Sequence, residues 1–134
     1  MLLRFIVFGC LGILWEIAFG AIKEIISKRN FDLRGSSSLW MFPIYGLVGF
    51  IYPIIAHQVA GLEWWWRGLV YTIIIYIFEY LFGSLLARIG VKAWHYTGKL
   101  AIFKGRLNLA YAPIWFLVGL GIEWLYPWIV AVSH

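Results

Sequence analysis

The chain has 134 residues, of which 63% are hydrophobic and 13% are charged, and its formal net charge is +5. A soluble domain carries about 25% charged residues, so this composition excludes a water-soluble globular protein and favours lipid as the solvent for most of the surface. The length allows one domain at most. The positive charge does not indicate a nucleic-acid partner, because most basic residues lie in two short segments between apolar runs, which is typical of a membrane topology signal.

Four apolar runs follow one another, over residues of about 2–22, 39–60, 68–89 and 109–131. Each has roughly the ~20 residues that a helix needs to cross ~30 Å of hydrocarbon at 1.5 Å per residue. Isolated strands would leave backbone groups unpaired in lipid, so we predict helices. The expected fold is an all-α, polytopic membrane protein with four transmembrane helices, in which residues 1–134 form a single transmembrane domain.

The basic residues predict the orientation of these helices. The two loops at 23–38 and 90–108, with their flanks, hold nine basic residues: Lys23, Lys28, Arg29, Arg34, Arg88, Lys92, Lys99, Lys104 and Arg106. Only Arg4 and Arg67 lie on the opposite side. Because short cytoplasmic loops carry an excess of Lys and Arg, we expect both basic loops in the cytoplasm and both termini outside.

The stretch 90–108 is the least regular part of the chain. It is too polar to span a membrane, yet it contains Trp94, Tyr96 and Phe103. Two interpretations stay open: a segment that lies on the membrane surface or dips between helices, and an ordinary solvated loop.

The two halves of the chain repeat each other. The segments Pro43–Gly49 and Pro113–Gly119 are identical at five of seven positions, and Glu16–Gly20 and Glu79–Gly83 at three of five. Two crossings return the chain to its starting side, so two helical hairpins with one orientation would form a parallel repeat about an axis along the membrane normal. Chance similarity between apolar segments is the alternative, and the matched Pro, Gly and Glu argue against it.

Three glutamates, Glu16, Glu79 and Glu123, fall inside the predicted spans, where an unshielded acid is costly. Each shares a helix face with small residues at spacings of four, and such faces mark close helix approach. We therefore expect all three to point into one polar cluster rather than at lipid.

The chemistry of this cluster is open at the level of sequence. The carboxyls can be protonated structural groups bonded to Tyr45 or Tyr111, they can hold a cation or cationic substrate, or Arg88 or Arg106 can reach them from the cytoplasmic side. Trp115 is a further lining candidate.

Other site candidates are in the last cytoplasmic loop: Trp94, His95, Tyr96, Arg106 and Asn108. No metal-ligand spacing and no Gly-rich phosphate loop occurs, so we expect no metal, no cofactor and no ATP hydrolysis by the chain itself. No nucleophile with a neighbouring base is evident, so no catalytic residue is assigned. The serines at 36–38 are expected to cap the second helix.

A specific set of residues extends over most of the chain in a characteristic order. They are Trp15-Glu16, Ser38-Leu39-Trp40, Ile44-Tyr45-Gly46, Tyr76, Glu79, Gly83, Trp94-x-Tyr96, Gly105, Leu109, Tyr111, Trp115 and Glu123. This pattern resembles the family of small four-helix membrane proteins catalogued as putative ABC-transporter type IV, which includes the animal transmembrane protein 229 group. The resemblance implies a four-helix membrane fold and a transport role. One departure is His95, which stands where the family usually has an acid.

The leading interpretation is a small permease-type protein that moves a proton, a cation or a polar solute through a site built on the three glutamates. Four helices enclose little volume, so we expect a homo-oligomer or a larger membrane complex, with the cytoplasmic loops as the docking place of any partner ATPase. A non-transporting membrane subunit or lipid-interacting scaffold is the second interpretation. A membrane enzyme acting on lipid, using the buried acids, His95 and Asn108, is the third.

Overall fold

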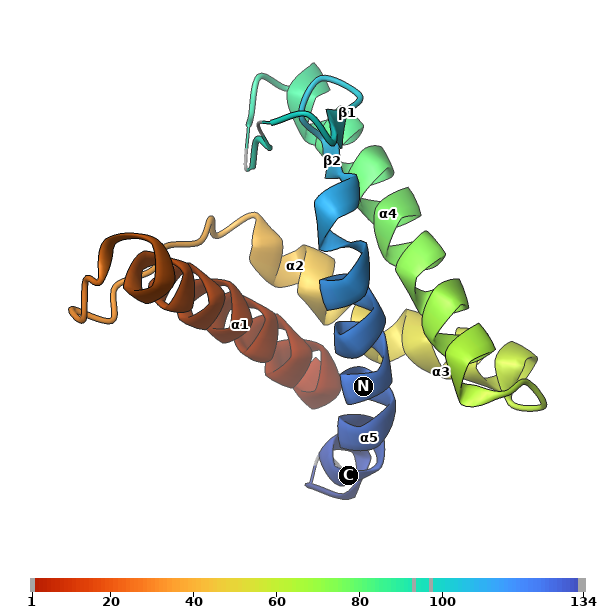
Figure 1. Cartoon of the computed structure of the whole chain (residues 1–134). Helices are drawn as coiled ribbons and strands as arrows, with labels where there is room; N and C mark the ends of the chain where they lie inside the picture. The colour runs from red at the N-terminus through yellow and green to blue at the C-terminus, as the bar shows by residue number, and fades with distance from the viewer. Residues whose placement is uncertain (1, 93, 97, 133–134) are drawn as a thin grey trace. The chain divides into compact units, whose positions relative to one another are not determined.

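Four helical segments among the described residues are long and apolar enough to cross a membrane: Leu2–Lys28, Met41–Val59, Trp64–Arg88 and Leu109–Val132. A computed structural model describes residues 2–92, 94–96 and 98–132 (Figure 1). Only 11–22% of the most apolar stretch of each segment is buried within the protein. Apolar helices with so little protein contact need lipid around them. The chain is an all-α, multi-pass membrane protein, as its sequence predicts.

The helices in chain order are α1 (Leu2–Lys28), α2 (Met41–Gly46), α3 (Val48–Val59), α4 (Trp64–Arg88) and α5 (Ala112–Val132). A short 3-10 turn, η1 (Leu109–Tyr111), leads into α5, and β1 (Ala101–Ile102) pairs with β2 (Leu107–Asn108). The contacts divide the chain into two compact units, one up to Pro53 and one from Ile54 to Val132. The single domain therefore stays a prediction.

Two helix ends differ from the sequence prediction by four residues or more. α1 continues six residues beyond its predicted end, so that Lys23 and Lys28 are helical rather than part of a loop. α4 begins at Trp64, four residues early, and so includes the run of three tryptophans. Hydropathy marks where an apolar run stops, but backbone hydrogen bonding continues through polar residues at an interface. The ion pair between Lys28 and Glu24, one turn apart at 3.4 Å, supports that extension.

In the first unit, α1 and α2 lie side by side because glycines on each helix make room for rings on the other (Figure 1). A Cβ atom on Gly46 would lie 2.7 Å from the Phe5 ring, and one on Gly12 would overlap the ring of Tyr45. Small residues at such places let helix backbones approach closely, which supplies the van der Waals packing that holds helices together in lipid.

In the second unit, α4 and α5 pack by the same means (Figure 1). The ring of Phe116 covers Gly68, and the side chain of Tyr71 covers Gly119. In the predicted repeat, Gly68 and Phe116 correspond to Phe5 and Gly46, so the large and small residues exchange helices between the hairpins. Such compensated packing agrees with the repeat, while superposition of the two hairpins stays a prediction.

The described part of the stretch after α4 contains a helix cap and a short β-hairpin. Gly90, at φ +80°, ends α4, and the amide of Val91 donates to the carbonyl of Leu86 at 2.9 Å in the pattern of a Schellman cap. The β1–β2 hairpin follows, and its tight connection contains Phe103 and Lys104 at positive φ. Its small sheet is the departure from an all-helical chain, and it places aromatic and basic side chains against the last turns of α4.

Candidate functional site

Glu16, in the first unit, is held by hydroxyl groups. The Ser37 hydroxyl donates to Oε2 at 2.6 Å, and the Tyr45 hydroxyl donates to Oε1 at 2.9 Å. The half-buried carboxylate forms no ion pair with any residue that the structure describes. The Tyr45 hydroxyl reaches the Glu16 carboxylate because the Tyr45 ring lies over Gly12, which precedes Glu16 by one turn of α1.

Ser37 was not predicted to belong to this site. The sequence suggested that the serines at 36–38 cap the second helix, but the N-cap residue of α2 is Trp40 and no side chain caps this helix. Ser38 accepts a hydrogen bond from the Trp40 amide at 3.3 Å, one residue before the helix begins. Ser37 instead turns towards α1. Gly35 permits this approach, since a Cβ atom there would overlap the backbone carbonyl of Ile17. A glycine two residues before a serine was the one signal for it.

Glu79, in the second unit, lies beside a row of aromatic side chains. The Tyr96 hydroxyl donates to its Oε1 at 3.2 Å, and the backbone amide of Tyr96 is fixed by the Gly105 carbonyl at 2.8 Å. The Tyr96 ring contacts Tyr111 edge-on at 5.1 Å, and Tyr111 contacts Trp115 at 6.2 Å. The structure thus brings four predicted site residues together.

The indole nitrogen of Trp115 in this row lacks a hydrogen bond: it is buried and has no hydrogen-bond partner among the described residues. A buried donor without an acceptor costs about 1–3 kcal/mol. A bound polar group beside Trp115 would remove that cost.

Glu123 differs from the other two glutamates because a cation holds it. Arg67 donates through Nε at 2.9 Å to one carboxylate oxygen and through Nη2 at 2.8 Å to the other. The Tyr71 hydroxyl donates to the same carboxylate at 2.7 Å. The sequence placed Arg67 in the outer loop and so missed this partner, and the early start of α4 explains why.

The expected single cluster is therefore wrong for Glu79 and Glu123. Glu123 binds to Arg67, and Arg67 precedes Glu79 by twelve residues on α4, which corresponds to about 18 Å along the helix axis. Neither Arg88 nor Arg106 forms an ion pair with one of the three glutamates in the part of the chain that the structure describes. Proximity of Glu16 and Glu79 stays a prediction.

The remaining loop candidates have structural partners. The Trp94 indole donates to the carbonyl of Arg106 at 3.0 Å, and the exposed ring of His95 covers Gly105. The Asn108 side chain accepts from the amide of Ala110 at 3.0 Å and so caps η1. Its backbone carbonyl accepts from the Tyr76 hydroxyl at 2.9 Å.

The glutamates differ in the kind of group that binds their carboxylates. An ion pair such as that of Glu123 and Arg67 is already neutral as a whole and suits a fixed helix–helix contact. A carboxylate held by hydroxyls, such as Glu16, keeps capacity for a proton or a cation, because a hydroxyl can serve as donor or acceptor.

The chain matches a family of known proteins. The family described as "Putative ABC-transporter type IV" matches residues 3–134, nearly the whole chain. No solved structure matches the chain.

Proposed function

Because the chain belongs to the putative ABC-transporter type IV family, we propose that it is a small permease-type protein that moves a proton, a cation or a polar solute across the membrane. Glu16 and Glu79 are the carboxylates that bind the transported proton, cation or solute. Tyr45, Tyr96, Tyr111 and Trp115 line them, and Glu123 stabilises the second hairpin.

The observation that carries this proposal is the difference between the glutamates. Glu16 accepts hydrogen bonds from the hydroxyls of Ser37 and Tyr45, Glu79 accepts from the Tyr96 hydroxyl, and Glu123 accepts from an arginine. Glu16 and Glu79 also occupy corresponding places in the two similar sequence segments. Ionisable groups inside spans commonly mark ion and proton pathways.

The proposal extends to the assembly. Two hairpins in a parallel repeat, related by rotation about the membrane normal, would bring corresponding carboxylates to one axis. We further propose a homo-oligomer or larger complex, and cytoplasmic basic loops that receive a partner ATPase. The exchange of Phe5 and Gly46 for Gly68 and Phe116 at corresponding contacts supports the repeat.

Vesicle flux tests the proposal. Purified protein is reconstituted in liposomes that contain a pH-sensitive dye, and a potassium gradient with valinomycin drives proton entry. In separate vesicles without valinomycin, dyes for Na⁺ and K⁺ report the cation alternatives. Glu16→Gln and Glu79→Gln should each reduce the flux to the level of protein-free vesicles, because an amide cannot ionise. Glu24→Gln is the matched control, since it removes a carboxylate at the exposed end of α1. Wild-type flux that both amide variants retain in full would contradict the proposal.

A non-transporting scaffold is the second candidate, and the Arg67–Glu123–Tyr71 contact favours it, because that contact joins α4 to α5 by charge and hydrogen bonds. Two substitutions of Glu79 separate the candidates. On the scaffold interpretation Glu79→Gln should be nearly silent, since an amide mimics a protonated carboxyl. Glu79→Ala should lower stability by about 1–3 kcal/mol, because it removes the carboxylate that accepts the hydrogen bond of the Tyr96 hydroxyl. Transport predicts lost flux with normal folding for Glu79→Gln.

A further inference from the structure

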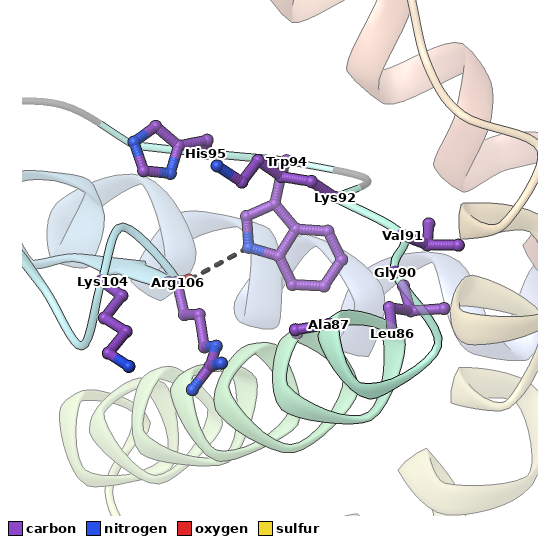
Figure 2. A pocket seen from close by; sticks show the side chains of 10 residues that line it. Leu86, Ala87, Gly90, Val91, Lys92, Trp94, His95, Lys104 and Arg106 are labelled. Carbon is purple, nitrogen blue, oxygen red and sulfur yellow. Dashed lines mark hydrogen bonds between the residues drawn. The ribbon is translucent and has the colours of Figure 1, made fainter.

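A cavity of about 320 Å³ lies between the last turns of α4 and the segment that folds back on them (Figure 2). Its apolar lining includes Leu86, Ala87, Val91 and the indole of Trp94. Its polar lining consists of Lys92, His95, Lys104 and Arg106. All of these residues belong to the second unit. The proposed permease site does not use this cavity.

The charge around this cavity has one sign. From Tyr80 to Ile122 the chain contains five basic residues and no Asp or Glu. The three cations of the lining, Lys92, Lys104 and Arg106, form no ion pair with any described residue. Like charges that converge on a partly enclosed space create a positive potential that attracts an anion.

Arg106 is positioned by packing and not by a counter-charge. A Cβ atom on Gly83 would lie 3.3 Å from its Cγ atom, so the aliphatic stem of Arg106 lies against α4. Its carbonyl accepts from the Trp94 indole at 3.0 Å, and its amide donates to the Phe103 carbonyl at 3.2 Å. Lys104 extends beside it towards α4 (Figure 2). An arginine whose aliphatic stem is already packed in place loses less side-chain entropy when an anion binds.

A second cavity of about 330 Å³ shares Ala87 and Arg106 with the first and is also lined by Ser84 and Arg88. The Ser84 hydroxyl is buried and has no hydrogen-bond partner in the described part of the chain. An oxyanion between the two arginines would accept from that hydroxyl. Arginine suits phosphate in particular, because its planar fork matches two phosphate oxygens.

We propose that Arg106, with Lys92, Lys104, Arg88 and Ser84, forms a binding site for a phosphate-bearing anion at the loop end of α4. The apolar lining beside the cations, from Leu86, Val91 and Trp94, accepts the hydrocarbon part of an amphiphile. An anionic phospholipid headgroup therefore fits the site best. A soluble phosphate ester has the same anionic group without the apolar part.

Equilibrium binding to purified full-length protein in neutral detergent micelles tests this site, with radiolabelled phosphatidylglycerol, phosphatidylcholine and glycerol 3-phosphate as probes. The wild type should prefer phosphatidylglycerol to phosphatidylcholine. Arg106→Gln should weaken phosphatidylglycerol binding by about tenfold, the loss expected for one hydrogen bond to a charged group. Because Arg106 also packs on Gly83, thermal unfolding without lipid must be compared.

The double variant Lys92→Gln, Lys104→Gln keeps the test independent of folding, since both side chains are exposed. It should weaken binding to a similar degree. Lys99→Gln is the matched control, because Lys99 is an exposed cation of the same segment that lines neither cavity.

The outcomes are distinct. Preference for phosphatidylglycerol that depends on Arg106 and not on Lys99 supports a lipid ligand. Binding of glycerol 3-phosphate with the same dependence, without a lipid preference, supports a soluble phosphate ester in the same site. An equal loss in the Lys99→Gln protein would show a diffuse surface charge, and binding of neither anion by the wild type would show an empty cavity; either result overturns the proposal.

Discussion

The contact between Arg67 and Glu123 can be measured by a double-mutant cycle. Arg67 uses Nε and Nη2 for the carboxylate, and its Nη1 donates to the carbonyl of Leu62 at 2.8 Å. Glu123→Leu therefore leaves Arg67 with an acceptor. Arg67→Met removes the cation that binds Glu123, and the hydrogen bond from the Tyr71 hydroxyl remains. We expect Arg67→Met to cost more stability than Glu123→Leu, and the double variant to cost less than the sum.

The size of the coupling follows from the exposure of the pair. The Arg67 and Glu123 side chains are 25% and 29% exposed. Exposed ion pairs contribute about 0–1 kcal/mol, and breaking a fully buried pair costs about 3–5 kcal/mol. A half-buried pair with two donors to one carboxylate lies between these limits, so we expect a coupling of about 2 kcal/mol.

Equilibrium unfolding in mixed micelles, followed by circular dichroism as the fraction of dodecyl sulfate increases, gives the four free energies. The matched control is the cycle of Glu24 and Lys28 on α1, whose side chains are 39% and 70% exposed. That pair should couple by about 0.5 kcal/mol or less. A coupling of Arg67 and Glu123 no larger than the control would refute the view that this ion pair joins α4 to α5.

Two further predictions test packing and topology. Gly119→Leu should destabilise the second hairpin by about 1–3 kcal/mol in the same unfolding assay, because a side chain there overlaps Tyr71 of α4. Gly121→Leu should change the stability little, because no atom lies within 4 Å of a Cβ at that position. Equal effects of the two substitutions would argue against close packing at Gly119. In a Cys10→Ala background, single cysteines at Lys28 and Lys99 should both resist an impermeant thiol reagent on intact cells, because both are expected in the cytoplasm. Labelling of both would reverse the orientation, and labelling of one alone would contradict the even number of crossings between them.

The helical membrane fold could be predicted from sequence because it depends on a local property. Each span is an apolar run of about 20 residues, long enough to cross the bilayer as a helix, and a helix pairs all backbone groups within the run itself. Helix ends were less predictable. α1 continues through Lys23, beyond the end of its predicted apolar run, and α4 begins at Trp64, before the start of its own. In both places backbone hydrogen bonding extends the helix past the apolar run.

The sequence also indicated which side chains are costly in a membrane, but not how each is satisfied. It identified Glu16, Glu79 and Glu123 from burial cost alone. Their partners Ser37, Tyr96 and Arg67 lie 21, 17 and 56 residues away in the chain. No periodicity carries such long-range pairings, because they depend on loop conformation and on which helix faces meet.

What sequence alone determined is the number and type of spans, the family pattern and the identity of the intramembrane acids. Only the tertiary structure divided those acids into Glu123, which an arginine neutralises, and Glu16 and Glu79, which hydroxyls hold. The tertiary structure also showed that the basic loop packs on α4, with Trp94 and Arg106 against Gly83, and that a cavity lies between the loop and the helix. The physical reason is that hydropathy acts on each residue separately, whereas hydrogen-bond partners and cavities arise only when distant segments pack together.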